Sequence, residues 1–597
     1  MELKARKYRL IDAVLICFSV CPFWTSVRLL STILWGLLPA AMVVVVARLI
    51  DTAIAIATHQ SQASLLGPLL MLIGMCALMG IGGTVSDFIW RRTGQAMTVA
   101  MTIAVVNKSA RLKYEHVENP EVWELVSRVS GDPSGRLGEL YSTMQSMVET
   151  LFSVASVFAL IAAVVWWMGL AVVVFCVPAY FLAYRLGKEK YNQEKQAVKH
   201  SRYADYFAGV LSGRGDVEER TLFGYGDELQ KRWERDYETA RKIRFDAQRK
   251  NFIRMKMASM VLIVLSLCLT GALVFPLRQG LLPVGMFCGL VTQIYLIVQR
   301  LGWSISWSIS SLTEGREYLA DLTTFSQLSE TPDAVVPRDD LRDFALDKIE
   351  FRDVCFAYPG TERNILAHLN LTLEAGINYA VVGVNGAGKT TLAKLLCRQY
   401  DNYTGEILIN GRELREYSMA WIKGFFGVVF QDFARYSISL RDNLTIGCLV
   451  PPAEEDLYEL IDKLGMRAWV DELPHGLDTP LGKILEAGHD LSGGQWQRVA
   501  IARCLAAPAC LRILDEPTAA LDPVSESEVY WLFHDISRGR SSIVITHRLG
   551  AARMADCILV LDGGAVVEQG NHDQLLEKGG IYASFFNSQR SWYHDEV

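Results

Sequence analysis

The sequence predicts a two-part fold, an α-helical six-span transmembrane domain followed by an α/β P-loop domain, and two observations support this prediction. Long charge-free runs recur before residue 314, whereas charged residues are spread evenly after about residue 330. The later part contains the segment Gly383–Thr390, which fits the phosphate-binding pattern G-x-x-x-x-G-K-[ST]. A chain of 597 residues is too long for one hydrophobic core, so several domains are expected.

Composition limits the class of partner. The formal net charge of −6 gives no reason to expect a nucleic acid partner, which would require a basic stripe. The 12 cysteines include no C-x-x-C pair, so we expect small buried side chains rather than disulfides or metal ligands. No cleavable signal peptide is expected, because the first apolar stretch, Leu10–Val20, contains Asp12 and leads into another apolar run.

Five charge-free runs predict the six spans. A helix needs roughly 20 apolar residues to cross the hydrocarbon core of a bilayer. One run is long enough for two helices joined by a turn near Met168 and Gly169. These spans make membrane lipid an expected partner. The five runs are Leu29–Ala47, Leu65–Ser86, Thr150–Tyr184, Met257–Leu277 and Gln279–Gln299.

Lysine and arginine predict the orientation of the spans. They cluster in the N-terminal segment 1–28 and after the second run, whereas the loop Asp51–Ser64 contains none. Because cytoplasmic loops carry the excess of basic residues, both termini and the second domain are expected in the cytoplasm. The sequence therefore predicts a multi-pass protein of the cytoplasmic (inner) membrane, with segment 1–28 along the inner interface.

Two polar stretches, Asp87–Met147 and Arg185–Lys256, are far longer than connectors need to be. Their composition predicts that the membrane helices continue into the cytosol. Each stretch has a central break, and short helices are expected at Pro120–Val126 and Asp216–Phe223. From composition alone, these tips are either docking elements for another domain or solvated loops.

The sixth span carries polar and aromatic residues at helical intervals. Polar groups inside a span usually face the bundle interior or a cavity, so this face is a candidate substrate lining. Helix packing and an interfacial aromatic belt are the alternatives, the latter above all for Trp307. The residues are Gln293, Tyr295, Gln299, Trp303 and Trp307.

The second domain follows a polar linker at 322–347, so the expected organisation is segment 1–28, transmembrane domain 29–321, linker 322–347 and α/β domain 348–597. In the last of these, β-rich runs alternate with helical patterns. The stretch Tyr379–Val382 is expected to be a strand and Leu392–Gln399 a helix. A strand before the glycine-rich loop and a helix after it is the context that a phosphate-binding loop requires.

This context assigns roles to individual residues. Backbone amides of the loop would cradle phosphates, Lys389 would reach the terminal phosphates, and the Thr390 hydroxyl would bind Mg²⁺. An apolar strand ends in Asp515, a candidate carboxylate ligand of Mg²⁺, and Glu516 is placed to activate water. Arg512 interrupts this strand, and we expect it at an edge-facing position. The loop residues expected to bind the nucleotide are Gly383, Asn385, Gly386, Gly388, Lys389, Thr390 and Thr391.

A second motif, Leu491–Gln495, has no role in an ordinary P-loop enzyme. Its Gly-Gly pair opens a helix and leaves free amides for a phosphate. The two motifs and the spans together resemble an ATP-binding cassette (ABC) half-transporter of the bacterial exporter type, with the type IV fold, over essentially the whole chain. The resemblance implies that a P-loop ATPase domain binds ATP and Mg²⁺, with Ser492, Gly493, Gly494 and Gln495 contributing to the nucleotide site.

The resemblance assigns further residues. It implies that Tyr358 stacks on adenine, that Gln431 senses Mg²⁺ as a metal and catalytic residue, and that His547 contacts the γ-phosphate as a catalytic residue. Asp522 matches the D-loop, and residues 486–488 match the exporter X-loop. The two cytoplasmic tips match the family's coupling helices.

The resemblance also implies a partner and a function. In the family each ATP lies between one P-loop and the signature motif of a second half-transporter, which here could be identical or different. The expected function is ATP-hydrolysing movement of a small molecule, lipid or peptide across the cytoplasmic membrane by alternating access, with export favoured. One alternative is an exporter-fold importer of a metal chelate. A second is an ATP-gated membrane regulator without transport, and the intact Glu516 disfavours this one because a gate needs ATP binding but not hydrolysis. The six predicted spans exclude a soluble ATPase.

Two departures from the family pattern are visible. Trp496 follows the signature where a polar residue is commoner, and the segment Asp432–Tyr436 differs from multidrug and lipid exporters. Phe433 and Tyr436 are candidates for a groove that receives a coupling helix. About 28 residues precede the first span, which argues against a peptidase domain and a leader-cleaving exporter.

Overall fold

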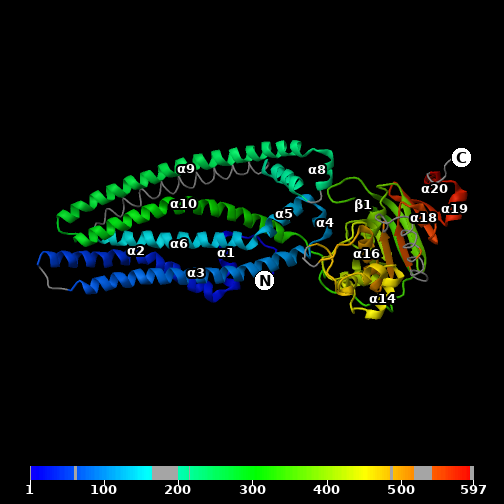
Figure 1. The fold of residues 1–597 in the computed structure, drawn as a ribbon, viewed down its shortest axis with the longest axis horizontal. Coiled ribbons are helices and arrows are strands. Elements are labelled where there is room, and N and C mark those ends of the chain that lie inside the picture. The colour runs from blue at the N-terminus through cyan, green and yellow to red at the C-terminus, as the bar shows by residue number, and fades with distance from the viewer. Residues whose placement is uncertain are drawn as a thin grey trace. The chain divides into compact units, whose positions relative to one another are not determined.

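The computed structural model describes residues 2–59, 64–164, 200–213, 216–483, 488–516, 531 and 541–591. The chain forms two compact units (Figure 1). Unit 1 contains Met1–Ser109 and Glu124–Leu328, and unit 2 contains Ala110–Trp123 and Ser329–Val597.

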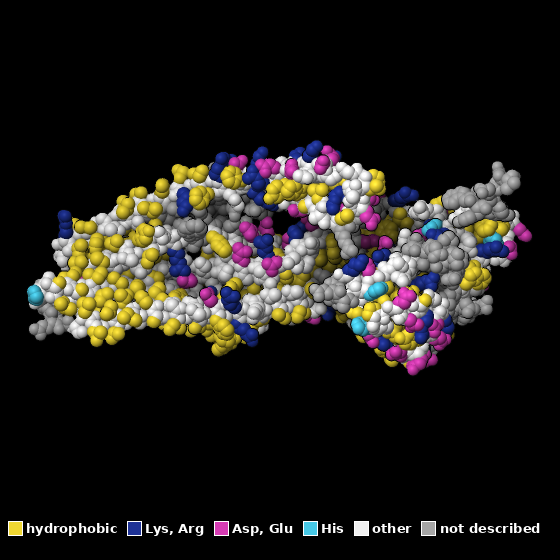
Figure 2. All heavy atoms as spheres, in the orientation of Figure 1, with side chains coloured by type: hydrophobic (Ala, Val, Ile, Leu, Met, Phe, Trp, Pro, Cys, Tyr) yellow, Lys and Arg dark blue, Asp and Glu magenta, His cyan; other side chains and the backbone are white. Residues whose placement is uncertain are grey.

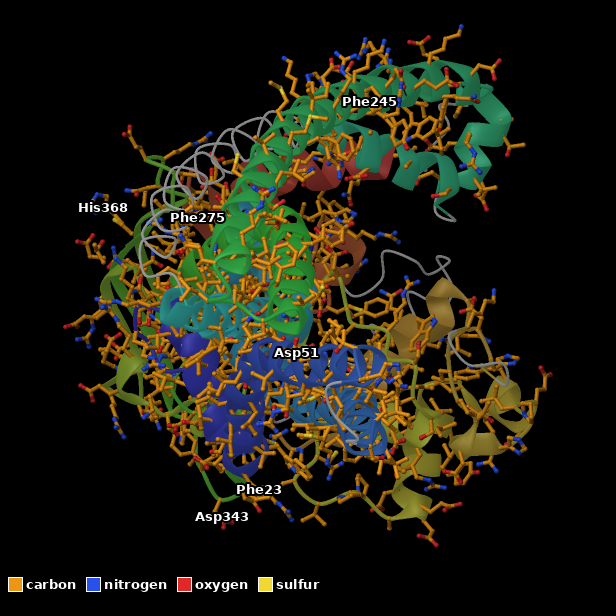
Figure 3. All side chains as sticks on the ribbon, turned by 90° about the vertical axis from the view of Figure 1, so that its left-hand side faces the viewer. Phe23, Asp51, Phe245, Phe275, Asp343 and His368 are labelled. Atoms are coloured by element: carbon orange, nitrogen blue, oxygen red, sulfur yellow. The ribbon has the colours of Figure 1, made fainter. Side chains whose placement is uncertain are left out.

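Unit 1 is helical. Its core lies where α2, α6, α9 and α10 meet, around side chains such as Val43, Leu273 and Leu290. Asp51 Oδ1 accepts the Gly285 amide at 2.7 Å and so ties the first turn of α10 to α2; Asp51 is labelled in Figure 3. The helices are α1 (Leu10–Val20), α2 (Pro22–Ala57), α3 (Leu66–Ser109), α5 (Pro120–Gly131), α6 (Pro133–Val164), α8 (Val217–Phe223), α9 (Gly226–Arg278) and α10 (Val284–Gln327).

Among the described residues, three helices are long and apolar enough to cross a membrane: Pro22–Ala57, Leu66–Ser109 and Pro133–Ala163. Shorter apolar segments occupy Ser266–Arg278 and Val284–Arg300, where further spans were expected. Figure 2 shows hydrophobic side chains gathered on the surface of this unit, as lipid-facing helices require. The second half of the predicted run 150–184 lies outside the described residues.

The start of the last predicted run, Gln279–Gln299, is wrong. Helix α9 ends at Arg278, and α10 begins only at Val284. Gly280 has φ +72° and Pro283 caps α10, so the chain turns between them. At the other end, α10 continues to Gln327, so residues 322–327 of the predicted linker are helical.

The tips of the two polar extensions agree with the sequence in one case and differ in length in the other. Helix α8 coincides with the predicted 216–223 segment and ends at Gly224, where φ is +63°. The predicted 120–126 helix is longer, since α5 runs to Gly131. A separate helix, α4 (Tyr114–Glu118), precedes it and lies wholly within unit 2. The docking role of the 120–126 segment stays a prediction.

Unit 2 contains two sheets. The antiparallel sheet has the order β2-β1-β4-β5, and the second has the order β10-β9-β3-β8-β7-β6 and is parallel except for β10. The strands are β1 (Lys348–Phe356), β2 (Leu366–Glu374), β3 (Asn378–Gly383), β4 (Thr404–Ile409), β5 (Arg412–Glu413), β6 (Phe426–Val429), β7 (Leu511–Asp515), β8 (Ser541–Ile545), β9 (Cys557–Asp562) and β10 (Ala565–Gly570).

Among the described residues, helices of unit 2 form three cores with these sheets. The first surrounds α11 between the sheets, and the second joins α13, α14, α15 and α16 around Trp496 and Val499. The third packs α18, α19 and α20 against β3 and β9 around Tyr582. The helices are α11 (Lys389–Leu396), α12 (Met419–Phe425), α13 (Leu440–Thr445), α14 (Glu454–Lys463), α15 (Arg467–Asp471), α16 (Gly493–Ala506), α18 (Leu549–Ala552), α19 (His572–Lys578) and α20 (Ile581–Ser591), with 3₁₀ turns at Leu414–Glu416 and Gly476–Asp478.

The expected edge-facing position of Arg512 is wrong. Strand β7 lies between β6 and β8 and is hydrogen-bonded on both sides. Arg512 is 3% exposed as a result. The interior place of β7 follows from long-range strand pairing, which the local sequence does not reveal.

The segment from Ser329 to Asp347 is fixed to unit 2. Arg338 donates to the carbonyls of Gly447 (3.2 Å), Gly424 (3.0 Å) and Pro508. Lys423 Nζ donates to the Ala334 carbonyl at 2.6 Å. Because these two cationic side chains donate hydrogen bonds to several backbone carbonyls, the segment is held against the rest of unit 2 and is not a free linker.

Candidate nucleotide-binding site

The glycine-rich loop connects buried strand β3 to α11. Gly388 has φ +101°, and a Cβ there would lie 2.6 Å from Leu366 Cδ2, so only glycine fits. Lys389 Nζ donates to the carbonyls of Gly383 (2.9 Å) and Val384 (3.1 Å). Burial lowers the pKa of Lys389, while Glu516 and Asp515 oppose that effect. The loop thus wraps around its own lysine, with Asn385 and Gly386 exposed outside.

A hydroxyl and a carboxylate meet at the start of α11. Thr390 Oγ1 lies 3.3 Å from Asp515 Oδ1, at the carboxyl end of β7. Asp515 is 1% exposed, and its Oδ2 has no hydrogen-bond partner among the described residues. Burial raises the pKa of Asp515, and the Thr390 hydrogen bond opposes the rise. A buried orphan carboxylate oxygen beside a hydroxyl fits the oxygen ligands that Mg²⁺ prefers.

Glu516 and His547 face each other across two strand ends. His547 Nδ1 lies 3.2 Å from Glu516 Oε1. The parallel pairing of β7 with β8 places Asp515 opposite Ile545, so the next residues emerge side by side. The Glu516 amide donates to the Ile545 carbonyl at 2.9 Å, with φ of +48° at Glu516. A non-glycine residue with positive φ is strained by about 1–3 kcal/mol, and such strain clusters at functional sites.

Tyr358 lies beside the phosphate loop. Its hydroxyl is 2.9 Å from Thr391 Oγ1, on α11. Lys394 Nζ lies 5.5 Å from the ring centroid, and Tyr400 meets the ring edge-on at 5.4 Å. The structure thus brings the predicted adenine-stacking residue to the helix that starts at Lys389.

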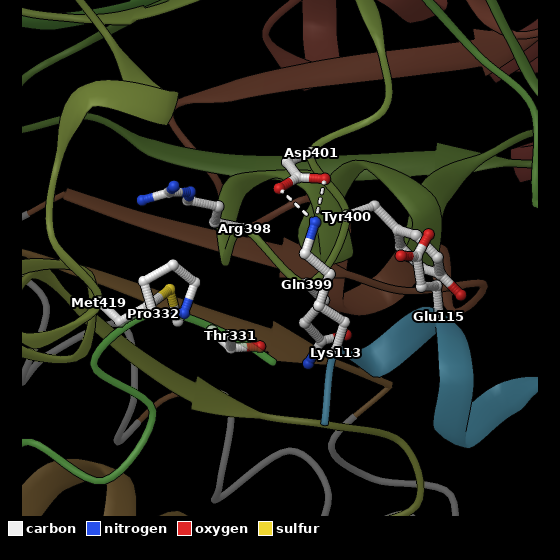
Figure 4. Close-up of a pocket in the computed structure, with 9 residues that line it drawn as sticks. All are labelled: Lys113, Glu115, Thr331, Pro332, Arg398, Gln399, Tyr400, Asp401 and Met419. Atoms are coloured by element: carbon white, nitrogen blue, oxygen red, sulfur yellow. Dashed lines mark hydrogen bonds and ion pairs between the residues drawn. The ribbon is translucent and has the colours of Figure 1, made fainter. Parts of the chain in front are cut away.

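Helix α4 belongs to the same neighbourhood. Glu118 accepts a hydrogen bond from Lys394 Nζ at 2.5 Å and another from the Tyr400 hydroxyl. Although burial opposes it, these two donors hold the pKa of Glu118 below its ordinary value. Lys113 pairs with Asp401 at 3.1 Å (Figure 4). The adjacent cavity of about 30 Å³ is large enough for water but not for a ligand.

The signature motif begins α16. Ser492 caps the helix by accepting the Gln495 amide at 3.2 Å, and Gln495 Oε1 accepts the Ser492 amide at 2.8 Å. Gly493 and Gly494 occupy the first two helical positions. Across the described part of the chain, no hydrogen bond or ion pair joins these residues to the phosphate loop, because α16 packs in the second core.

Trp496 is a core residue. It is 3% exposed within the core of α13–α16. The unusual residue after the signature therefore packs inside the domain and is not part of the exposed nucleotide surface. Next to the signature, Asp490 pairs with Lys483 at 2.7 Å, and this ion pair is the main cause that lowers the pKa of Asp490.

For the remaining predicted site residues, the structure shows no hydrogen bond or ion pair with the phosphate loop among the described residues. Gln431 is exposed and follows β6, whose pairing with β7 sets Val429 opposite Leu514. Gln431 therefore follows β6, and β6 is the sheet neighbour of β7, the strand that ends in Asp515. Asp522 and X-loop residues 486–487 lie outside the described residues.

Sequence reasoning missed several residues around the site. Glu118, Lys394 and Tyr400 join α4 to α11 from distant parts of the chain, so no local pattern could find them. Gln589 contacts the backbone of His547 across 42 positions. Asp490 could have been found, because a carboxylate directly before a helix-opening motif is a common capping signal.

The chain matches two family models. Residues 27–301 match the ABC transporter transmembrane region, and residues 366–519 match the ABC transporter domain. It is 28% identical over 568 residues to the subtilin transport ATP-binding protein SpaT of Bacillus subtilis, covering 94% of this chain and 90% of that protein. It is also 29% identical over 528 residues to the ATP-dependent lipid A-core flippase of Aromatoleum aromaticum, covering 86% and 84% of the two chains.

A solved structure shares the fold. The bacterial Atm1-family ABC exporter with ATP bound superposes with a TM-score of 0.77 at 23% identity, over 96% of this chain and 99% of that one. At this identity the likeness establishes the fold alone. Together with the two family matches, it confirms the predicted helical transmembrane domain followed by a P-loop ATPase domain. The chain belongs to the ABC transporters and is a half-transporter of the exporter type.

Proposed function

We propose that this chain is one half of a dimeric exporter that hydrolyses ATP to move a small molecule, lipid or peptide out across the cytoplasmic membrane. The observation that carries the proposal is the 3.2 Å approach of His547 to Glu516, directly after Asp515. A carboxylate base, a histidine beside it and a buried metal-binding carboxylate at neighbouring strand ends suit phosphoryl transfer to water.

The nucleotide would be held by residues that the fold gathers at α11. Loop amides from Gly383 to Thr390 bind the phosphates, Lys389 turns its ammonium from the loop carbonyls to the terminal phosphates, and Tyr358 stacks on the adenine. Asp515 Oδ2 and Thr390 Oγ1 would hold Mg²⁺, with Gln431 approaching from β6. The ion supplies positive charge against the phosphate oxygens when bound.

For hydrolysis, Glu516 accepts a proton from the attacking water, and His547 orients the carboxylate and the terminal phosphate. The water oxygen bonds to the γ-phosphorus as the bond from that phosphorus to the terminal oxygen of ADP breaks, so ADP and inorganic phosphate are the two products. Asp515 and Lys389 are buried, which strengthens the charge interactions at this end of the site. Once the γ-phosphate has separated from ADP, the nucleotide loses the contacts that this phosphate made with the site.

A second chain completes the site. The signature residues Ser492–Gln495 present helix-opening amides on a different core from the phosphate loop, so they suit the ATP of a partner half-transporter. ATP held between two chains binds the closed pair better than the open pair. This difference in affinity is what drives alternating access.

Exposed apolar side chains support the dimer. On α8, Leu222 is 78% exposed and Phe223 is 67% exposed. In unit 2, the segment after β6 exposes Tyr436, Ile446, Leu449 and Val450. Because a solvated protein rarely exposes many large apolar side chains without use, we propose that the partner's α8 docks on this segment. Phe433, in the same segment, is partly buried against the core of α13–α16.

The transport path would lie along α10. Tyr295 and Trp307 are exposed, Gln299 donates to the Tyr295 hydroxyl at 2.7 Å, and Gln293 is buried. The side chain of Trp303 lies outside the described residues. We propose that the exposed members of this face line the cavity between two half-transporters.

The names of the relatives, a subtilin transporter and a lipid A-core flippase, support outward movement of an amphipathic molecule.

Steady-state ATPase activity of this chain alone in lipid nanodiscs tests the proposal, with Glu516→Gln as the blank. Activity above the blank supports a homodimer with two complete sites and allows a screen for stimulating substrates. A folded chain that binds ATP but does not exceed the blank points to a different partner half. Equal activity in the wild type and Glu516→Gln, both well above a vesicle background, would refute Glu516 as the base.

A further inference from the structure

We infer that Gln589, on the C-terminal helix α20, is a positioning residue for hydrolysis because its amide clamps the backbone loop that carries His547. The inference rests on the proposed role of His547. Gln589 Nε2 donates to the His547 carbonyl at 2.7 Å, and Gln589 Oε1 accepts the Leu549 amide at 3.0 Å. One planar group thus holds two peptide groups on either side of Arg548.

The clamped loop lies between two buried residues. It runs from β8, which ends at Ile545, to α18, which begins at Leu549, so the His547 carbonyl belongs to neither element. Thr546 and Leu549 are 1% and 2% exposed, whereas the His547 side chain is 50% exposed. Packing therefore holds the two ends of the loop, and the position of the His547 imidazole 3.2 Å from Glu516 depends on the orientation of the His547 backbone.

Both hydrogen bonds replace interactions that the local fold does not provide. Leu549 is the first residue of α18, and first-turn amides have no acceptor within their own helix. The Arg548 amide is satisfied by Thr546 Oγ1 at 3.0 Å, which leaves the two outer peptide groups to Gln589. The glutamine side-chain amide presents a neutral donor and a neutral acceptor in one plane, as these two peptide groups require.

Helix α20, which carries Gln589, is held in place by buried contacts. Glu568 is buried and its carboxylate accepts the amides of Ile581 (2.7 Å) and Tyr582 (3.0 Å), which satisfies the first turn of α20. Tyr582 is fully buried in a core cluster with Val382 of β3, the strand that leads into the phosphate loop, and Val560 of β9, the strand paired with β3. Gln589 follows Tyr582 by two helical turns and so projects from the same face.

This arrangement makes a specific kinetic prediction. The clamp touches His547 but no residue of the phosphate loop, so its loss should lower kcat for ATP while KM changes little. Misplacing a reacting group by about 1 Å costs roughly 10- to 100-fold in rate. A residue that only stabilised the domain would instead lower the amount of folded protein and leave the kinetics of the folded fraction unchanged.

Two substitutions in the full-length chain in nanodiscs test the clamp. Gln589→Leu removes both hydrogen bonds, and Gln589→Glu keeps the acceptor for Leu549 but loses the donor to His547. Asn587→Asp makes the matching amide-to-acid change at an exposed site on the same helix. We expect kcat to fall about 10- to 100-fold in both Gln589 variants, with KM within about two-fold, and no change in Asn587→Asp.

Hydrogen exchange of a peptide covering 546–549 gives a second readout that does not depend on turnover. Exchange should accelerate in Gln589→Leu and remain at the wild-type rate in Asn587→Asp. Unchanged exchange, or unchanged kcat in an active wild-type background, would overturn the inference. If the wild type does not exceed the Glu516→Gln blank, the chain does not form a complete ATPase site by itself, and the proposal of a homodimer fails. The exchange measurement still tests whether Gln589 restrains the His547 backbone.

Discussion

The carboxylate of Glu118 lies 2.5 Å from the Nζ of Lys394, so an anion on α4 contacts a cation on α11, the helix that begins at the phosphate loop. Lys394 also lies 5.2 Å from the ring centroid of Tyr114 and 5.5 Å from that of Tyr358. One lysine therefore joins the C-terminal end of α4 to the candidate adenine-stacking ring. Nucleotide binding and the position of α4 should influence each other through this side chain.

Glu118→Gln should loosen α4 from its site. The substitution removes the charge of an ion pair with a partly exposed partner, which contributes about 1 kcal/mol or less. We expect faster hydrogen exchange in residues 112–119, with Glu121→Gln, an exposed change three positions away, as the control. Equal exchange in Glu118→Gln and the wild type would show that the pair does not restrain α4.

Glu516→Gln should retain ATP binding and lose turnover. The amide cannot accept the proton of water at neutral pH, and removal of a general base costs about 100-fold or more. ATPase rate and equilibrium binding of a fluorescent ATP analogue measure the two effects separately. Glu577→Gln, an exposed change on α19, provides the control. Weakened binding together with full turnover would contradict the assignment.

Lys389→Ala should weaken nucleotide binding itself. A charged hydrogen bond to phosphate contributes about 1.5–3 kcal/mol, which corresponds to roughly 10- to 100-fold in Kd. The exposed Lys463→Ala on α14 removes the same charge away from the loop. ATP affinity that is equal in both variants would count against a phosphate-binding role for Lys389.

Two substitutions at Tyr358 should separate its ring from its hydroxyl. Tyr358→Phe keeps the ring and loses the 2.9 Å contact with Thr391, whereas Tyr358→Ala loses both. We expect a fall in ATP affinity of roughly two- to ten-fold for Tyr358→Ala and a smaller one for Tyr358→Phe. Isothermal titration would measure both. If neither substitution changes affinity, the ring does not stack on the base.

Trp496→Ala should destabilise the core of α13–α16. Trp496 is 3% exposed in that core, and removal of a buried tryptophan side chain leaves a cavity that costs about 3–5 kcal/mol. Thermal unfolding of the full chain compares the variant with the wild type. An unchanged unfolding temperature would show that the indole does not support this core.

Local sequence was sufficient for the elements with a strong local signal. The glycine-rich loop lies between a buried strand and a helix, as its pattern requires, and among the described residues three of the charge-free runs coincide with helices long and apolar enough to cross a membrane. These features depend on side-chain polarity and backbone preference over a few neighbouring residues. The capping box of Ser492 and Gln495 belongs to the same class, since both partners lie within one turn.

Only the tertiary structure could decide which distant residues meet. The pairing of β7 with β8 brings Glu516 to His547, the interior place of β7 buries Arg512, and the fold delivers Glu118 to Lys394 and Gln589 to the His547 backbone. These contacts depend on strand order and helix packing, which are set by burial across the whole domain. By itself the sequence determined the family, the chemical groups of the site and the secondary structure around each of them. The packed sheet decided which of these groups are partners, because contacts between distant segments produce no repeating pattern in the sequence.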